Sequence, residues 1–142
     1  MASPSHALLI HSLQEAHAAL STFLSDSHAL ASTAKAIDTL VATINTGHKI
    51  MICGNGGSLA DAAHFAEELT GRFRNDRRPL PALAFADPFH ITCTANDYGF
   101  DQIFSRLVHA HAKPGDALIL LSTSGNSPNI RLAAEAAKER SV

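Results

Sequence analysis

The stretch that most constrains the fold is the run CGNGGS at residues 53–58, which follows a short apolar segment. The apolar segment is typical of a buried strand, and the glycines let the backbone turn sharply and approach a ligand closely. Ser58 and Asp61 are spaced like a capping box, which predicts a helix that begins at Leu59 and stops at Gly71. The expected unit is strand, glycine loop and helix, and the free N–H groups at the start of the helix favour an anion.

The predicted helix carries a second signal, the pair His64 and Glu68. Residues four apart share one face of a helix, and an imidazole and a carboxylate at this spacing can bind a metal ion together or transfer a proton. The alternative interpretation is an ordinary solvated helix face. The solvated face is the commoner case for such a pair, but the preceding anion-binding type of loop and the apolar neighbours of the pair add weight to the functional role. We expect Glu67 to point elsewhere as a surface residue.

The composition indicates one globular domain in a reducing compartment. The chain has 142 residues, of which 46% are hydrophobic and 17% charged, and its net charge is −2. This charge does not indicate a general nucleic-acid surface, and we find no apolar run of membrane length and no secretion signal. We therefore expect a cytoplasmic protein without nucleic-acid or membrane partners. Cys53 and Cys93 are expected to be small buried residues, with no pattern that supports a disulfide.

Two amphipathic helices are predicted before the first strand, over about residues 5–24 and 29–44. Ser25 to Ser27 separates them, and Asn45 to Gly47 ends the second. They either cover the domain or, in the case of the first helix, pack against another subunit, and the sequence leaves both alternatives open. The histidines of this part follow no ligand spacing and are expected to be exposed: His6, His11, His17 and His28.

The middle of the chain contains a basic loop and a second strand. The loop at residues 72–79 has four arginines, and it is either simply solvated or sends one arginine to an anionic substrate. A strand is predicted at residues 82–86, followed by a short helix at 89–95. Asn96 and Asp97 would then lie near the carboxyl end of the second strand, where α/β proteins bind ligands. Asp101 is expected to cap a further helix.

A second anion site is predicted after a third strand at residues 117–121, which is apolar throughout, as in a parallel strand covered on both faces. The run STSGNSP follows at residues 122–128, with Ser127 as the N-cap and Pro128 in the first helical position. The loop places several hydroxyls at a helix N-terminus. Neither this loop nor the glycine loop matches a dinucleotide or nucleoside triphosphate fingerprint. The chemistry favours a small phosphosugar-type ligand.

Four motifs together resemble the phosphoheptose isomerase family, which has the sugar isomerase (SIS) fold. They are CGNGGS at 53–58, HFAEELTGRF at 64–73, ANDYGF at 95–100 and STSGNS at 122–127. The resemblance implies an α/β fold, a three-layer αβα sandwich around a parallel sheet, preceded by two N-terminal helices. It implies a single SIS domain over residues 1–142, with helices in 5–46 and the α/β core in 48–142. A homotetramer with bound zinc is also implied.

The resemblance implies conversion of sedoheptulose 7-phosphate to D-glycero-D-manno-heptose 7-phosphate, for lipopolysaccharide core or a related surface polysaccharide. Glu68 matches the catalytic acid/base, which would act on the carbon-bound proton of an aldose–ketose isomerisation. His64 and Glu68 match zinc ligands, and zinc could polarise the substrate oxygens. Residues that match substrate contacts are Asn55, Gly56, Gly57, Ser58, Glu68, Asn96 and Asp97, and the phosphate cradle matches Ser122, Thr123, Ser124 and Ser127.

The chain departs from the family pattern at its end. The family completes its zinc site with a Gln and a His on a later helix, whereas this chain stops at Val142, and two protein ligands are few for zinc. The family's strand order 2-1-3-4-5 places the two loops at the switch point. Without the last strands and helix, it leaves the outer edge of the third strand bare, an arrangement that invites aggregation. We therefore expect a fragment of a longer protein, poorly folded or inactive alone.

Two alternative functions stay open at this point. One relative of the family binds the bacterial replication initiator without being an enzyme, and other SIS domains sense a phosphosugar for regulation. Relatives of the first kind lack the glutamate of the His-x-x-x-Glu pair, whereas this chain has Glu68. Those of the second kind accompany a DNA-binding domain. The enzyme is therefore the preferred interpretation.

Overall fold

The computed structural model describes residues 3–142 and divides into two compact units, with the boundary between Thr39 and Leu40. The first unit contains α1 (Pro4–Ser25) and most of α2 (Ser27–Asn45). Asp26 breaks the helical run as predicted, since its carboxylate accepts the N–H groups of His28 and Ala29 at the start of α2. All four histidines of the predicted helices are exposed, as expected. No helix within residues 3–142 has the length and hydropathy needed to cross a membrane.

The second unit is built on a parallel sheet of the strands β1 (Ile50–Gly54), β2 (Ala82–Ala84) and β3 (Ala117–Leu121). The strand order is β2-β1-β3, so β1 is central, and Gly54 pairs with Leu121 at its carboxyl end. This is the predicted beginning of a 2-1-3 order. β3 lies at the edge of this sheet and its five residues are only half-buried, rather than covered throughout as the sequence predicted.

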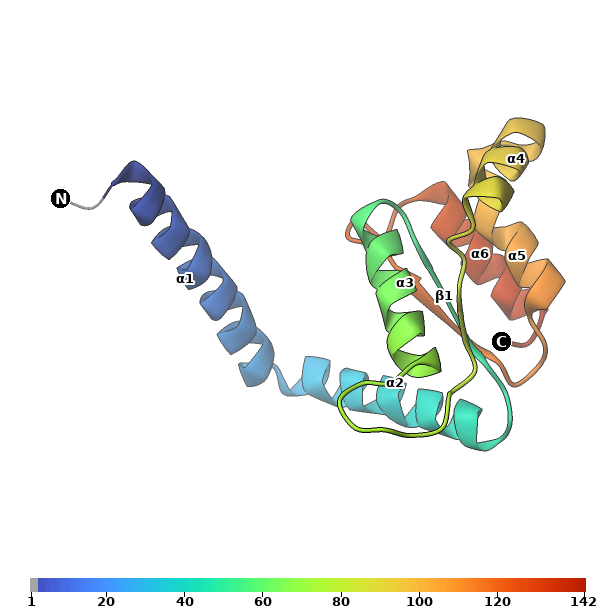
Figure 1. The fold of residues 1–142 in the computed structure, drawn as a ribbon, viewed down its shortest axis with the longest axis horizontal. Helices are drawn as coiled ribbons and strands as arrows, with labels where there is room; N and C mark the ends of the chain where they lie inside the picture. The colour runs from blue at the N-terminus through green and yellow to red at the C-terminus, as the bar shows by residue number, and fades with distance from the viewer. Residues whose placement is uncertain (1–2) are drawn as a thin grey trace. The chain divides into compact units, whose positions relative to one another are not determined.

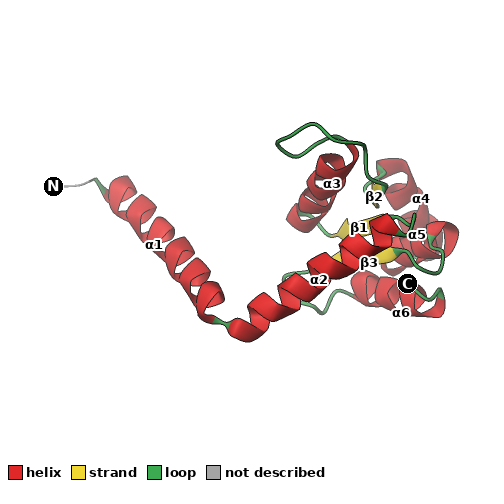
Figure 2. Cartoon of the chain, turned by 90° about the horizontal axis from the view of Figure 1, so that it is seen from below, coloured by secondary structure: helices red, strands yellow, loops and turns green. Residues whose placement is uncertain are grey.

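Helices cover both faces of the sheet and make three layers (Figures 1 and 2). Side chains alternate along β1: Ile50 and Ile52 pack against α3 (Gly57–Thr70) and the last turn of α2. Met51 and Cys53 pack against α5 (Ile103–His111) and α6 (Pro128–Glu139). The central strand is thus buried on both sides, and the αβα prediction is confirmed.

The helix after β2 is longer than predicted. α4 spans Pro88–Tyr98 because Asp87 caps it, accepting the N–H of His90, and Gly99 ends it with φ of +88°. Asn96 and Asp97, where the predicted helix was expected to end, therefore lie in its last turn. The prediction for Asp101 was also wrong. That residue lies within a short 3₁₀ helix, η1 (Phe100–Gln102), and makes no cap for α5.

The two cysteines have opposite environments. Cys53 is buried as predicted, and desolvation raises the pKa of its thiol to about 12, so it stays protonated and unreactive. Cys93 was predicted to be buried but is exposed, because α4 places it on a face that the core does not cover. Both thiols are free within the described residues.

The amino ends of β1 and β3 are joined by one buried carboxylate, Asp116. It accepts the backbone N–H groups of Lys49 at 3.0 Å and Lys113 at 2.8 Å, and it pairs with the Lys49 ammonium. Burial raises the pKa of Asp116, but the hydrogen bonds from Lys49 and Lys113 outweigh it, and the net pKa is lowered. Beside it, Gly115 has φ of +92° and faces the ring of His48.

Candidate functional site

The glycine loop lies at the carboxyl end of β1 and turns directly into α3. The helix begins at Gly57, two residues earlier than predicted, because Gly56 is the N-cap with φ of +55°. No side chain caps α3, so the predicted capping box of Ser58 does not form. A Cβ on Gly54 would lie 2.7 Å from the Ser58 carbonyl oxygen. Only glycine permits this close approach of strand and helix.

The serine loop lies at the carboxyl end of β3. The Ser122 hydroxyl accepts the N–H of Gly125 at 3.0 Å, and the Ser124 hydroxyl accepts the N–H of Asn126 at 3.2 Å. Ser127 is the N-cap of α6 and Pro128 follows it, as predicted, although the Ser127 hydroxyl makes no capping hydrogen bond. Thr123 is exposed on the same loop. The loop therefore presents hydroxyls at a helix N-terminus, an arrangement suited to an anion.

A pair of amides joins the two loops across 74 positions of sequence. Asn55 Nδ2 donates to Asn129 Oδ1 at 2.9 Å, and Asn129 Nδ2 donates back to Asn55 Oδ1 at 2.8 Å. Asn129 is 1% exposed. Sequence reasoning missed this residue, although an apolar face of α6 that includes an asparagine was a signal for a buried polar partner.

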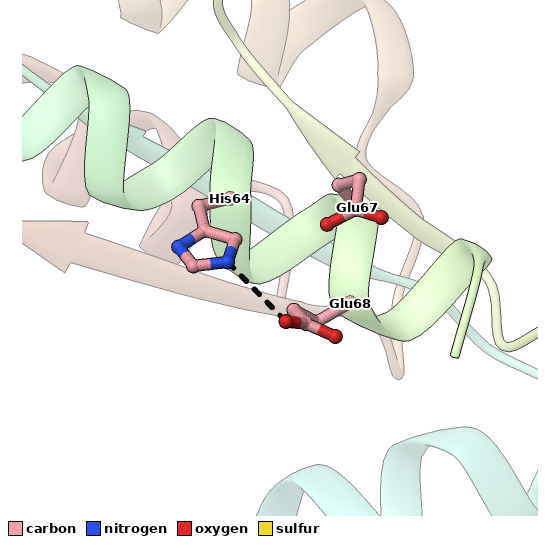
Figure 3. A group of neighbouring side chains, drawn as sticks. All are labelled: His64, Glu67 and Glu68. Atoms are coloured by element: carbon pink, nitrogen blue, oxygen red, sulfur yellow. Dashed lines mark hydrogen bonds and ion pairs between the residues drawn. The ribbon is translucent and has the colours of Figure 1, made fainter. Parts of the chain in front are cut away.

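His64 and Glu68 meet on α3 as predicted. His64 Nε2 lies 3.2 Å from Glu68 Oε1, as Figure 3 shows with a dashed line. His64 is exposed and Glu68 is half-buried. Glu67 is a surface residue as predicted and points away from the His64–Glu68 contact (Figure 3), although one of its carboxylate oxygens lies within 4.8 Å of a ligand atom of each of the other two. These three side chains are a possible metal-binding group.

A cavity of about 420 Å³ opens beside this pair. Arg77, one of the four arginines of the basic loop, lines it and donates to the carbonyl oxygens of Glu68 and Leu69. This arginine therefore holds the last turn of α3, on which Glu68 lies. The lining residues are Asp61, His64, Phe65, Glu68, Leu69, Phe73 and Arg77.

Asn96 and Asp97 form a small cluster of their own on α4. Asn96 Nδ2 donates to Asp97 Oδ1 at 2.8 Å, and the Cys93 thiol donates to Asp97 Oδ2 at 3.5 Å. This hydrogen bond, with the charge of Asp97, raises the pKa of the Cys93 thiol. Within residues 3–142, no hydrogen bond joins this cluster to either loop or to the pair on α3.

Comparison with known proteins adds the family context. A family model described as the SIS domain matches residues 13–142. The phosphoheptose isomerase of Cytophaga hutchinsonii is 47% identical over 94% of this chain and 70% of its own length. That of Vibrio cholerae is 48% identical over 95% of this chain and 71% of its own length.

Solved structures agree with this comparison. The phosphoheptose isomerase GmhA of Neisseria gonorrhoeae matches with a TM-score of 0.84 and 36% identity, over 98% of this chain and 71% of that one. A phosphoheptose isomerase from Francisella tularensis matches with a TM-score of 0.83 and 33% identity, over 99% of this chain and 72% of that one. The chain thus spans about seven tenths of the length of these relatives.

Proposed function

The chain belongs to the SIS domain family, and within it to the phosphoheptose isomerases; on this premise we propose that it converts sedoheptulose 7-phosphate to D-glycero-D-manno-heptose 7-phosphate. This reaction supplies heptose for lipopolysaccharide core or a related surface polysaccharide. The observation that carries the proposal is the His64–Glu68 pair at 3.2 Å beside the cavity on α3. A replication-initiator scaffold and a phosphosugar sensor are not favoured, because the relatives are isomerases and Glu68 is present.

The two loops bind the substrate at opposite ends of the same site. The serine loop holds the phosphate through the hydroxyls and backbone N–H groups at the start of α6. The glycine loop brings the backbone of Gly56 and Gly57 close to the sugar, because neither residue has a side chain to exclude it. The polar residues in this arrangement are Asn55, Ser58, Asn96, Asp97, Ser122, Thr123, Ser124 and Ser127.

Glu68 is the proposed catalytic residue. An aldose–ketose isomerisation moves a proton between adjacent carbons through an enediol, and it needs a base at the carbon and an acid at the oxygen. The Glu68 carboxylate removes the proton from the first carbon and returns it to the neighbouring carbon, while the hydroxyl proton on the first oxygen leaves and the neighbouring carbonyl oxygen gains a proton. Arg77 holds the Glu68 carbonyl oxygen, which keeps the last turn of α3 and its carboxylate in place.

His64 and Glu68 on α3 would supply two of the ligands of a zinc ion. Two ligands at about 2.1 Å from a tetrahedral zinc lie about 3.4 Å apart, and the 3.2 Å separation of His64 Nε2 and Glu68 Oε1 is close to this value. An imidazole and a carboxylate are suitable donors. When bound, zinc would polarise the oxygens of the substrate. A His64→Ala variant is expected to lose zinc content, measured by atomic absorption after dialysis.

The chain is proposed to be one SIS domain, a cytoplasmic protein that works as a homotetramer. The support for the assembly is α1, which has no buried residue and exposes apolar side chains that include Leu9, Leu13 and Leu20. An exposed apolar helix face is stabilised when a second copy covers it. Light scattering on the purified chain tests this proposal, and a monomer at micromolar concentration would contradict it.

The experiment that tests the function is Glu68→Gln, which keeps the size of the side chain but removes the base. We expect turnover of sedoheptulose 7-phosphate to fall by about 10²–10⁴-fold, while binding of the substrate, measured by calorimetry, survives. The matched control is Glu135→Gln on the exposed side of α6, which should leave turnover unchanged. Turnover of Glu68→Gln within twofold of the unchanged protein would contradict the proposed role.

A further inference from the structure

We infer that the Asn55–Asn129 amide pair holds the two substrate loops in one arrangement, with Asn129 as a positioning residue. The inference rests on the proposed function, since the glycine loop and the serine loop are the substrate loops of that proposal. It adds a role for Asn55, which the resemblance assigns to the substrate alone.

The geometry of the pair is reciprocal. Each amide donates one hydrogen bond and accepts one, at 2.9 and 2.8 Å, so the two side chains form a closed ring of hydrogen bonds. Asn129 is 1% exposed, so water cannot easily replace its partner, whereas Asn55 is half-buried. A buried amide that loses its partner is left with an unpaired polar group. The free-energy cost of that unpaired group favours the paired arrangement.

The pair lies where a fixed spacing between the loops matters. Asn55 directly follows Gly54, the last residue of β1, and Asn129 is the second residue of α6, directly after the N-cap Ser127 and Pro128. Within residues 3–142, no other side-chain hydrogen bond joins the two loops. The amide pair therefore sets the distance between the backbone at one end of the substrate and the phosphate cradle at the other.

Apart from the hydrogen bonds of the Ser122 and Ser124 hydroxyls, side chains constrain the glycines of the two loops little. A Cβ added at Gly56, Gly57 or Gly125 would meet nothing within 4 Å, so no side chain packs there. Gly56 and Gly125 also have positive φ, in a region where glycine is free to move between conformations. When a loop becomes ordered only as the substrate binds, the entropy cost of ordering weakens the affinity for the substrate. A loop that is already ordered avoids this cost.

Asn129→Asp is the sharpest test, since it keeps the size of the side chain and a favourable acidic residue at the start of α6. The new carboxylate cannot donate to Asn55 Oδ1 and places oxygen against oxygen. Ile130→Val is the matched control, because it removes one methylene from the next buried position of α6 and leaves the amides untouched. Asn55→Ala and the double variant Asn55→Ala/Asn129→Asp complete the set.

We expect Asn129→Asp to weaken the affinity for sedoheptulose 7-phosphate, measured by calorimetry, by about tenfold or more. Asn55→Ala should lose a similar factor, and the double variant should lose no more than the worse single variant, because both remove the same clamp. Ile130→Val should stay within twofold even if its melting temperature falls. An Asn129→Asp affinity within twofold, or single losses that multiply in the double variant, would overturn the inference.

A second readout separates the clamp from the function. Failure of the unchanged protein to bind sedoheptulose 7-phosphate would overturn the proposed function and leave the clamp to be judged by NMR. The ¹⁵N relaxation of the Gly56 and Gly125 amides should show greater mobility in Asn129→Asp than in Ile130→Val. Equal relaxation in the two variants would overturn the clamp itself.

Discussion

The two ends of β1 and β3 are each joined by polar side chains, but in different ways. At the amino ends, Asp116 is 7% exposed. Its carboxylate accepts hydrogen bonds from the backbone N–H groups of Lys49 and Lys113 and forms an ion pair with the Lys49 ammonium. At the carboxyl ends, Asn55 and Asn129 make two neutral hydrogen bonds between loops that contain glycines at positive φ.

We expect this difference to separate stability from binding. The Asp116 carboxylate at the amino ends accepts the backbone N–H groups of Lys49 and Lys113. These hydrogen bonds are stronger than neutral ones because their acceptor is charged. The loops at the carboxyl ends are joined by the uncharged Asn55–Asn129 pair, and several of their residues, including Gly56, Thr123 and Ser124, are exposed. One end of the sheet is therefore expected to respond to mutation with lost stability, and the other with lost activity.

Gly54→Ala should have the largest effect and should break the carboxyl end. The added Cβ would lie 2.7 Å from both the Cβ and the carbonyl oxygen of Ser58, so the first turn of α3 must move. We expect a loss of about 3 kcal/mol in unfolding free energy, measured by urea titration, and at least a hundredfold loss of isomerase turnover. Gly57→Ala, whose Cβ meets nothing within 4 Å, should leave the unfolding free energy unchanged or slightly higher.

Asp116→Asn should destabilise the amino ends of β1 and β3 and leave the proposed substrate site unchanged. The substitution replaces the charged carboxylate that pairs with the Lys49 ammonium by a neutral amide. Because this ion pair is lost, we expect the unfolding free energy to fall by about 2 kcal/mol. The specificity constant for sedoheptulose 7-phosphate should stay within twofold. The control is Asp38→Asn on the exposed surface of α2, which should change neither quantity. A large loss of turnover without a loss of stability would invalidate the division between the two ends.

Gly115→Ala should destabilise the amino end by about 1–2 kcal/mol, since alanine disfavours φ of +92°. Its Cβ would also lie 2.6 Å from His48 Nε2. Gly47→Ala is the matched control because Gly47 has φ of +84° and an added Cβ there would meet nothing within 4 Å. That variant therefore has the backbone strain without the steric contact. Thermal melts of both variants measure the difference, and equal losses would mean that the His48 ring moves aside without cost.

The pH dependence should be the smallest effect and should sharpen the comparison. The folded pKa of Asp116 is lowered, so its contribution is fully present above the unfolded pKa near 4 and is lost as pH falls through the folded value. The unfolding free energy should therefore decline as the pH drops below about 4. Asp116→Asn should flatten this slope in urea titrations between pH 2 and pH 6. An unchanged slope would show that other carboxylates dominate.

Local pattern predicted most of the elements. The strands, the first two helices and the start of α6 were predicted within a few residues, because each depends on neighbouring residues such as Ser127 and Pro128. The His64–Glu68 pair was predicted from helical spacing alone. The errors fell where a cap decides the boundary, as at Gly56 and Gly99, or where burial decides the environment, as at Cys93.

The sequence by itself determined the alternation of strands and helices, the two loops that follow β1 and β3 and the paired residues on α3, because hydrophobic period and turn chemistry act over short distances, while the αβα layers were implied by the family resemblance. Only the tertiary structure decided that Asn55 meets Asn129 and that Lys49 meets Asp116, across 74 and 67 positions. Such pairs depend on strand order and on the direction of each side chain, which no local pattern records. The tertiary structure likewise decided that Arg77 returns to the last turn of α3, where it holds the backbone of Glu68.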